Sequence, residues 1–251
     1  MDPADFRRHG HALVDWIAEY LAGPERYPVL PRVSPGDVRR ALPAEAPERG
    51  DAFEAIFADF ERILVPALTH WNHPAFFGYF AITASEPGIL AELLSAALNQ
   101  QAMLWRTSPA ATELEEVALG WLRGLMGLPA SFEGVIYDTA LIASLHALAA
   151  AREADIPGVR QAGLAAHGVP VRVYCSEHAH SSIDKAVILL GLGHQALRKV
   201  PADEQFRMRA DALRASIAED RAAGVQPLAV VATLGTTSTT SVDPVAAIAA
   251  I

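Results

Sequence analysis

The feature that most constrains the fold is an alternation of strand-like and helix-like segments in the second half of the chain. From residue 134 on, short runs rich in valine and isoleucine are followed by alanine-rich or amphipathic stretches of helical length. Strands that alternate with helices form a mainly parallel sheet with helices on both faces. The sequence therefore predicts an α/β fold, in which ligands bind beyond the carboxyl ends of the strands.

The expected strands of this half are 134–137, 171–174 and 227–233, and its expected helices are 139–153, 181–190, 210–223 and 244–251. The first half is helical instead, because its apolar residues recur at helical spacing over 5–21, 53–68, 86–99 and 109–126. Several prolines between the first two helices mark an extended connector. No compact partner for the apolar stripes of these two helices is evident nearby, so we expect the arm to pack on the rest of the chain or on another subunit.

Charge and cysteine content restrict the class of protein. The net charge of −9 argues against nucleic acid and anionic membranes as partners, because both select basic surfaces. A single cysteine cannot form an internal disulfide and fits a reducing compartment. The N-terminus lacks the charged and apolar regions of a signal peptide, and no apolar run is long enough to span a bilayer. We expect a soluble cytoplasmic protein.

Three hydroxyl-rich turns lie where predicted strands end and helices begin. They are Thr139-Ala140, Ser181-Ser182 and Gly235-Thr236-Thr237. Free N–H groups and a positive dipole end make helix N-termini suitable for an anion. Each turn alone is more often a simple helix cap, but three on successive strand ends favour a bound phosphate. The glycine-rich patterns of dinucleotide and ATP sites are missing, which disfavours those ligands.

Two imidazoles and a thiol, at Cys175, His178 and His180, adjoin the second of these turns. A metal site is disfavoured, because side chains alternate between the faces of a strand and no second ligand cluster stands out. An imidazole beside a phosphate site can stack on a heteroaromatic ring or act as an acid or base. A flat ring that carries a phosphate describes pyridoxal 5'-phosphate. The alternative for His180 is a capping or core histidine, which His178 keeps as well.

Aromatic side chains cluster over 74–80, where Phe76, Phe77, Tyr79 and Phe80 follow Trp71 at short distance. A buried core loop is one interpretation of this cluster. A wall for a planar substrate is the other.

Eight motifs, taken in order, resemble the N-terminal part of the group II pyridoxal-phosphate-dependent amino acid decarboxylases of the aromatic-L-amino-acid decarboxylase type. They occupy 6–10, 14–16, 33–36, 69–74, 76–80, 105–115, 179–186 and 232–237, the last two being the most specific. The resemblance covers essentially the whole chain. It implies a fold type I homodimer whose N-terminal arm, here 1–84, packs on the partner subunit, and a large cofactor-binding domain, incomplete over 85–251.

The resemblance also implies a function and a set of site residues. The family removes the α-carboxyl group of an L-amino acid, here expected to be aromatic, with pyridoxal 5'-phosphate and no metal. Carried over by position, His180 is the catalytic histidine that stacks on the cofactor ring, and Thr236 lies beside the cofactor. The remaining implied positions are Thr139 and Ala140 in the phosphate turn, and Trp71, Tyr79 and Phe80 around the substrate.

Two departures from the family pattern matter. Leu141 and Ile142 follow Thr139-Ala140 where the family has a hydroxyl residue, so we expect weaker phosphate anchoring. The family's ring aspartate and Schiff-base lysine come later than Asp243-Pro244, and Lys185 and Lys199 do not sit in the lysine motif. We therefore expect a truncated or split chain without the C-terminal small domain, inactive alone and completed by a C-terminal chain. The alternative is a non-catalytic, dimerising homologue.

Overall fold

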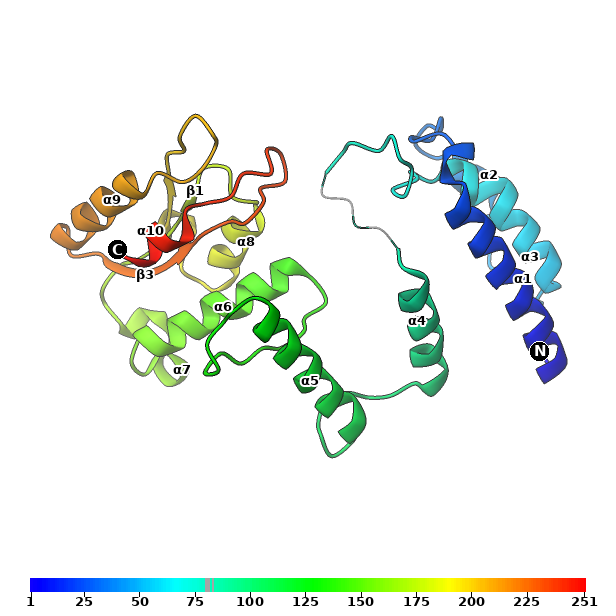
Figure 1. Cartoon of the computed structure of the whole chain (residues 1–251), viewed down its shortest axis with the longest axis horizontal. Helices are drawn as coiled ribbons and strands as arrows, with labels where there is room; N and C mark the ends of the chain where they lie inside the picture. Colours follow the sequence, from blue (N-terminus) through cyan, green and yellow to red (C-terminus); the bar gives the residue numbers. More distant parts are fainter. Residues whose placement is uncertain (80–81, 83) are drawn as a thin grey trace. The chain divides into compact units, whose positions relative to one another are not determined.

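The computed structural model describes residues 1–79, 82 and 84–251, and Figure 1 shows its elements. The chain divides into two compact units, Met1–Leu98 and Asn99–Ile251. The predicted division after residue 84 stays a prediction.

The first unit is helical, as the periodicity predicted. Its elements are α1 (Pro3–Ala22), η1 (Pro24–Arg26), α2 (Asp37–Ala41), α3 (Phe53–Asp59), the π-helical turn η2 (Phe60–Leu64), η3 (Val65–Ala67) and α4 (Glu86–Leu98). The Asp2 carboxylate caps α1 by accepting a hydrogen bond from the Asp5 amide at 2.8 Å. Helices α1 and α3 run side by side in Figure 1.

Aromatic rings join these two helices. The Trp16 ring lies edge-on to Phe60, with 5.2 Å between ring centroids, and His9 stacks on Phe53 at 4.2 Å. The apolar stripes of the arm therefore pack partly on each other, which the sequence did not indicate. Phe6 and Ile56 remain more than half exposed, so part of the apolar surface of the arm is still uncovered.

The second unit contains the sheet. Its elements are α5 (Pro109–Leu125), α6 (Ala140–Asp155), α7 (Val159–Ala162), η4 (Leu164–Ala166), β1 (Val171–Ser176), α8 (Ser182–Leu189), η5 (His194–Ala196), β2 (Leu197–Val200), α9 (Ala210–Ala222), β3 (Gln226–Val231) and α10 (Val245–Ala249). The strands lie in the order β2-β1-β3, and β1 is parallel to both neighbours. This confirms the predicted parallel sheet.

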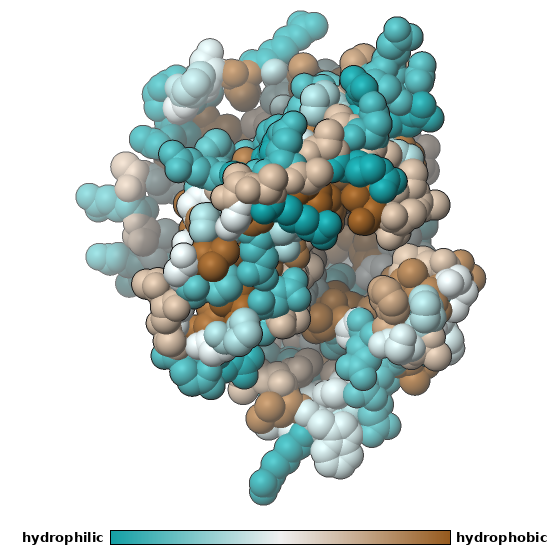
Figure 2. Space-filling model, turned by 90° about the vertical axis from the view of Figure 1, so that its left-hand side faces the viewer, coloured by the Kyte–Doolittle hydropathy of each residue, from teal (hydrophilic) through white to brown (hydrophobic). Residues whose placement is uncertain are grey.

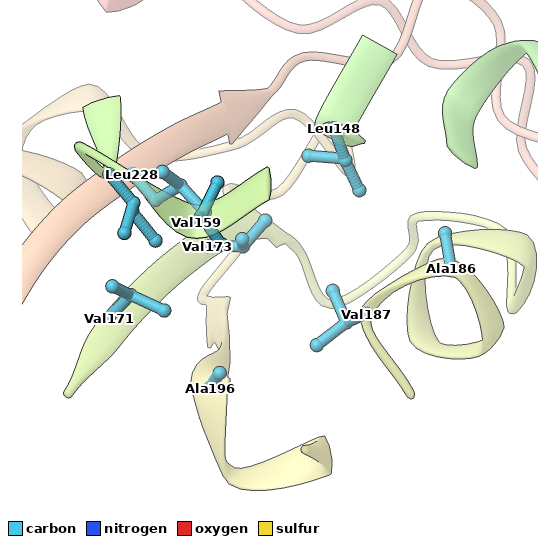
Figure 3. Packing of buried hydrophobic residues seen from close by; sticks show 9 residues of the cluster. Leu148, Val159, Val171, Val173, Ala186, Val187, Ala196 and Leu228 are labelled. Carbon is cyan, nitrogen blue, oxygen red and sulfur yellow. The ribbon is translucent and has the colours of Figure 1, made fainter. Parts of the chain in front are cut away.

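The alternation of side chains along β1 gives the sheet two buried faces. Val171 and Val173 pack with Leu148 of α6 and with Ala186 and Val187 of α8 (Figure 3). A second cluster covers the opposite face, where Tyr174 and Val200 meet residues of α9 and α10, namely Leu213, Ile217 and Ile248. Helices therefore cover both faces, as expected for a parallel sheet.

Two elements differ from the sequence prediction. Residues 134–137 form no strand, because none of the described strands pairs with them and an extended segment needs a partner for its backbone groups. Conversely, β2 was not predicted, since two of its four residues are the charged Arg198 and Lys199. Within the described part of the chain, none of the helices combines the length and the apolar character needed to cross a lipid bilayer.

Candidate functional site

The three hydroxyl-rich turns follow or precede elements that surround one cavity. Because β1 and β3 are parallel, their carboxyl ends lie at the same edge of the sheet. A cavity of about 340 Å³ is lined from three elements there, by Ser144, Ala147 and Leu148 of α6, Ile183 of α8, and 229–232 at the end of β3. Thr139 lies at the start of α6, His180 just before α8 and Thr236 shortly after β3. The three predicted turns thus belong to one unit and adjoin the ends of elements that line one cavity.

His180 is exposed in the turn that links β1 to α8. Its Nδ1 atom accepts a hydrogen bond from the Ser182 amide at 3.2 Å, and its carbonyl accepts one from Ile183 at 3.1 Å. The first bond orients the imidazole, and the second fixes the backbone of His180 at the start of the helix. No aromatic ring of the described residues stacks on it, so its faces are available to a flat ligand.

The start of α6 offers backbone donors to an anion. The Thr139 hydroxyl accepts the Ile142 amide at 3.3 Å, and the Thr139 carbonyl accepts the Ala143 amide at 3.0 Å. The amides of Ala140 and Leu141 have no acceptor among the residues that the structure describes. Two unpaired N–H groups at the positive end of a sixteen-residue helix suit a phosphate. The exposed carboxylate of Asp138 opposes this.

Thr236 is 2% exposed, and its hydroxyl is already used within its own loop. The Oγ1 atom lies 2.6 Å from the Thr239 hydroxyl and accepts the Ser241 amide at 3.2 Å. The preceding Gly235 has φ +90°, a conformation that residues with a Cβ rarely adopt. Thr236 therefore shapes the turn after β3 more than it offers a free hydroxyl.

The Cys175 thiol lies in the sheet and not in the turn. It is fully buried, and burial raises the pKa of the thiol, against the nearby Lys199 ammonium, which lowers it. The ammonium of Lys199 itself lies 2.8 Å from the Asp184 carboxylate. Burial tends to raise the pKa of Asp184, but the hydrogen bond from Lys199 holds that pKa below its usual value. Lys199 is thus committed to an ion pair.

The predicted substrate residues belong to the first unit. The Trp71 ring lies tilted against Phe76, with ring centroids 4.7 Å apart, and stacks on Tyr79 at 5.7 Å. Tyr79 is 77% exposed with φ +54°, so its ring faces solvent in an uncommon backbone conformation. Phe80 lies outside the described residues. Two of the predicted substrate residues, Trp71 and Tyr79, thus lie together with Phe76 in a partly exposed cluster, and their role stays a prediction.

Sequence reasoning missed the residues that hold the loops at this edge of the sheet. The buried Asp243 carboxylate accepts the Met208 amide at 2.6 Å and the Thr233 amide at 2.8 Å. The Ser241 hydroxyl donates to the Phe206 carbonyl at 2.8 Å, and the Phe206 ring lies edge-on to His178 at 5.3 Å. Spacing could not have shown these contacts, because they join loops up to 35 residues apart in the chain.

The residues present fit pyridoxal 5'-phosphate in two respects. The exposed His180 ring offers a surface for a flat heteroaromatic ring, and the free amides of Ala140 and Leu141 offer donors for a phosphate. These are the two kinds of contact that a planar phosphate ester needs. A carboxylate at position 138 and an apolar side chain at position 141 reduce the strength of the phosphate end.

Comparison with known proteins gives a consistent result. A family model described as the pyridoxal-dependent decarboxylase conserved domain matches residues 35–251. The aromatic-L-amino-acid decarboxylase of Mus musculus is 42% identical over 252 residues, which cover 94% of this chain and 51% of that protein. A tyrosine decarboxylase of Oryza sativa is 40% identical and matches 100% of this chain and 48% of its own length.

Solved structures agree with the sequence relatives. The tryptophan decarboxylase of Catharanthus roseus, in complex with L-tryptophan, superposes with a TM-score of 0.92 at 36% identity, covering 100% of this chain and 54% of that one. The Oryza sativa structure described as TDC with PLP and tryptamine superposes with a TM-score of 0.90 at 34% identity, covering 100% and 55%. The likeness confirms the predicted fold type I architecture. The chain spans about half the length of the curated relatives that it matches.

Proposed function

This chain belongs to the pyridoxal-dependent decarboxylase family, and from that premise we propose that the protein is a carboxy-lyase that removes the α-carboxyl group of an L-amino acid. The observation that carries the proposal is the arrangement of α6 and α8, which line one cavity together with the end of β3. The free amides lie at the start of α6, and the exposed His180 ring comes just before α8. The family uses pyridoxal 5'-phosphate. When bound, this group supplies an electron sink for the pair released as CO2 leaves.

The role of the chain's own residues is to bind and orient. We assign the Ala140 and Leu141 amides to the phosphate, with Thr139 holding the first turn of α6 in place. The imidazole of His180 supports one face of the cofactor ring, fixed by the hydrogen bond from the Ser182 amide. Thr236 acts through its buried hydroxyl, which keeps the loop after β3 in its shape beside the cofactor.

We propose an aromatic substrate. The support is the cluster of Trp71, Phe76 and Tyr79, whose rings give an apolar wall of the kind that planar ligands favour. The named relatives include aromatic-L-amino-acid, tyrosine and tryptophan decarboxylases, which is compatible with this choice. Phe80 belongs to the same proposal by its place in the motif.

The lysine that carries the cofactor in the family is not assigned to this chain. Lys199 is paired with Asp184, and Lys185 is exposed on α8 outside the family's lysine motif. We therefore propose that catalysis requires a C-terminal segment, in the same protein or as a complementing chain, that supplies the lysine and the ring aspartate. The chain by itself is then a cofactor-binding half.

We also propose a homodimer. Apolar residues that recur at helical spacing on α5 are exposed, the largest being Leu114, Trp121 and Leu125. Figure 2 shows apolar side chains, in brown, at the surface between hydrophilic ones. Contiguous exposed apolar side chains often mark contact surfaces, and the family buries its N-terminal arm on a partner subunit. Cytoplasmic location remains part of this proposal.

A second candidate function is a non-catalytic homologue that dimerises without chemistry. The observation that favours it is the phosphate turn, where Asp138 adds a negative charge and Leu141 replaces a hydroxyl residue of the family. Such a protein would bind pyridoxal 5'-phosphate weakly or not at all.

Complementation separates the two candidates. The chain is mixed with a separately produced C-terminal half of the mouse relative, and CO2 release is measured from L-tryptophan, L-tyrosine and L-glutamate. We expect release only in the mixture and only from the aromatic substrates. The same mixture with His180→Ala serves as the control for background chemistry. A mixture that assembles but neither binds the cofactor nor releases CO2 would favour the non-catalytic homologue.

A further inference from the structure

Phe206 holds a backbone conformation that its side chain disfavours. Its φ is +60°, in the left-handed region where a Cβ crowds the backbone. The residue ends a tight turn in which the Phe206 amide donates to the Asp203 carbonyl at 2.9 Å, and the Asp203 amide donates to the Arg207 carbonyl at 2.9 Å. Glycine or asparagine normally occupies such a position, so phenylalanine there stores strain.

The surroundings hold Phe206 in place from two sides. The Arg207 guanidinium pairs with the Asp203 carboxylate at 2.7 Å and closes the turn. The Ser241 hydroxyl donates to the Phe206 carbonyl at 2.8 Å and ties this turn to the loop after β3. The strained conformation is therefore fixed by contacts from two loops.

Burial does not explain why the residue is an aromatic one. The Phe206 side chain is 47% exposed, so it contributes little to the core. Its ring contact is with His178, whose imidazole lies at 5.3 Å between centroids and 81° between planes, an edge-to-face geometry that is favourable for aromatic pairs. The ring thus reaches the turn between β1 and α8, two residues before His180.

That turn is anchored firmly at its first residue, where the Glu177 amide donates to the Val200 carbonyl at 3.0 Å and the Glu177 carboxylate accepts the Ala202 amide at 2.8 Å. The next two residues bond locally, the His178 amide to the Ser176 hydroxyl at 3.2 Å and the Ala179 amide to the Ser176 carbonyl at 3.0 Å. Its end is held by the bonds of His180 to Ser182 and Ile183 described above. His180 and Ser181 in the turn are exposed, and the Phe206 ring extends the contacts from the segment after β2 beyond Glu177 to His178.

We propose that Phe206 is a positioning residue, which orders the turn 178–182 and thereby fixes the His180 ring for a flat ligand. The role of His180 toward a cofactor rests on the proposed function, whereas the ordering of the turn does not. Strain at Phe206 is retained because a residue without a ring would relax the backbone and release His178. The Phe206 ring and the turn 178–182 therefore act as one support for the cofactor edge of the sheet.

Relief of strain should leave thermal stability the same or higher, whereas loss of the ring should reduce the order of the turn 178–182. The two effects can therefore be measured separately. Phe206→Asn and Phe206→Gly relieve the left-handed strain, and Phe206→Tyr keeps both the strain and the ring as the matched control. Thermal unfolding and amide hydrogen exchange of residues 178, 179, 182 and 183 are measured on the 251-residue chain. Binding of pyridoxal 5'-phosphate is measured on the same samples by equilibrium dialysis.

We expect the asparagine and glycine variants to unfold at the same or a slightly higher temperature, by up to about 4 °C. Exchange at the four amides should become roughly two- to tenfold faster, which is the loss expected for one aromatic pair. Cofactor affinity should fall by a similar factor, and Phe206→Tyr should match the wild type in all three. A fall in unfolding temperature with unchanged exchange would overturn the inference, because the ring would then be a structural contact only.

The cofactor measurement keeps the two proposals apart. If the wild type binds pyridoxal 5'-phosphate and the asparagine variant binds it equally well with equal exchange, the positioning role is wrong and the proposed cofactor site stands. If the wild type does not bind while exchange at the turn still rises in the variants, the ordering role stands and the cofactor site is wrong.

Discussion

A buried polar network behind the sheet gives a stability prediction whose size follows from its geometry. The Tyr174 hydroxyl donates to the Asp220 carboxylate at 2.8 Å, and Arg198 and Arg172 approach the same oxygen at 3.2 and 3.4 Å. Tyr174 is fully buried and Asp220 is 5% exposed. The network joins β1, β2 and α9, and so holds the strand that leads into the His180 turn.

Tyr174→Phe removes one hydrogen bond to a charged group, which is worth roughly 1.5–3 kcal/mol. Asp220 keeps both arginines in that variant, so we expect a loss of free energy of unfolding near the lower end, about 1.5 kcal/mol. Asp220→Asn leaves the two guanidinium groups without their buried partner and should cost more, roughly 3 kcal/mol, since Arg198 retains Glu219. The double variant should lose less than the sum of the two.

Urea unfolding followed by circular dichroism measures these differences at pH 7. Tyr137→Phe is the matched control, because the Tyr137 hydroxyl makes no hydrogen bond within the described residues, and it should leave stability unchanged. If Tyr174→Phe costs no more than Tyr137→Phe, or if the losses in the double variant simply add, the network does not couple these elements and the reasoning is refuted.

The same network predicts a pH dependence. Burial tends to raise the pKa of Asp220, but the Tyr174 hydroxyl and the Arg198 guanidinium hold that pKa below its usual value. A carboxyl whose folded pKa is lowered stabilises the fold above its unfolded pKa of about 3.9, and loses that contribution as the pH falls through the folded value. The difference between wild type and Asp220→Asn should therefore be constant near neutral pH and shrink below about pH 4.

Three further predictions follow from the proposed function. The 251-residue chain alone should release no CO2 from aromatic amino acids above a cofactor-only background, and release that is lost in His180→Ala would contradict the assignment of the lysine to another segment. If its hydroxyl reaches the phosphate, Leu141→Ser should tighten pyridoxal 5'-phosphate binding in the complemented protein by roughly 1.5–3 kcal/mol, measured by absorbance titration. Equal affinity would show that this side chain does not face the phosphate. Light scattering should find a dimer or larger species, and the double variant Leu13→Asp with Ile17→Asp should convert it to monomer or aggregate. A monodisperse wild-type monomer at micromolar concentration would mean that the arm packs on its own subunit.

Sequence patterns predicted those parts of the fold that depend on local periodicity. The strands β1 and β3 and the helices α6, α8 and α9 were placed within a few residues, because each has an apolar face of the right period. Strand β2 was not predicted because it carries two charged side chains. Both form ion pairs with other elements, Arg198 with Glu219 and Lys199 with Asp184. A pattern of apolar residues cannot show a strand whose charges are satisfied by distant side chains.

For the candidate site, the sequence could suggest positions but not contacts. The resemblance and the expected topology both put His180 and Thr139 at one edge of the sheet, and these assignments stay a prediction. The strained Phe206 was not foreseeable, because its carbonyl is held by the Ser241 hydroxyl of a loop that it meets only in the fold. The buried Thr236 hydroxyl was missed because its bonds depend on the shape of its own loop. The segment 134–137 failed for the same reason, since a strand exists only where a neighbour accepts its hydrogen bonds.

The most direct test of the central claim is a titration of the chain with pyridoxal 5'-phosphate by equilibrium dialysis, comparing wild type, His180→Ala and His11→Ala. His11 is exposed in the first unit and serves as the control for non-specific loss of an imidazole. If the His180 ring supports the cofactor, His180→Ala should weaken binding about two- to tenfold, the value of one ring-stacking contact, while His11→Ala binds as the wild type does. Equal affinity in all three proteins would contradict a cofactor site at this edge of the sheet.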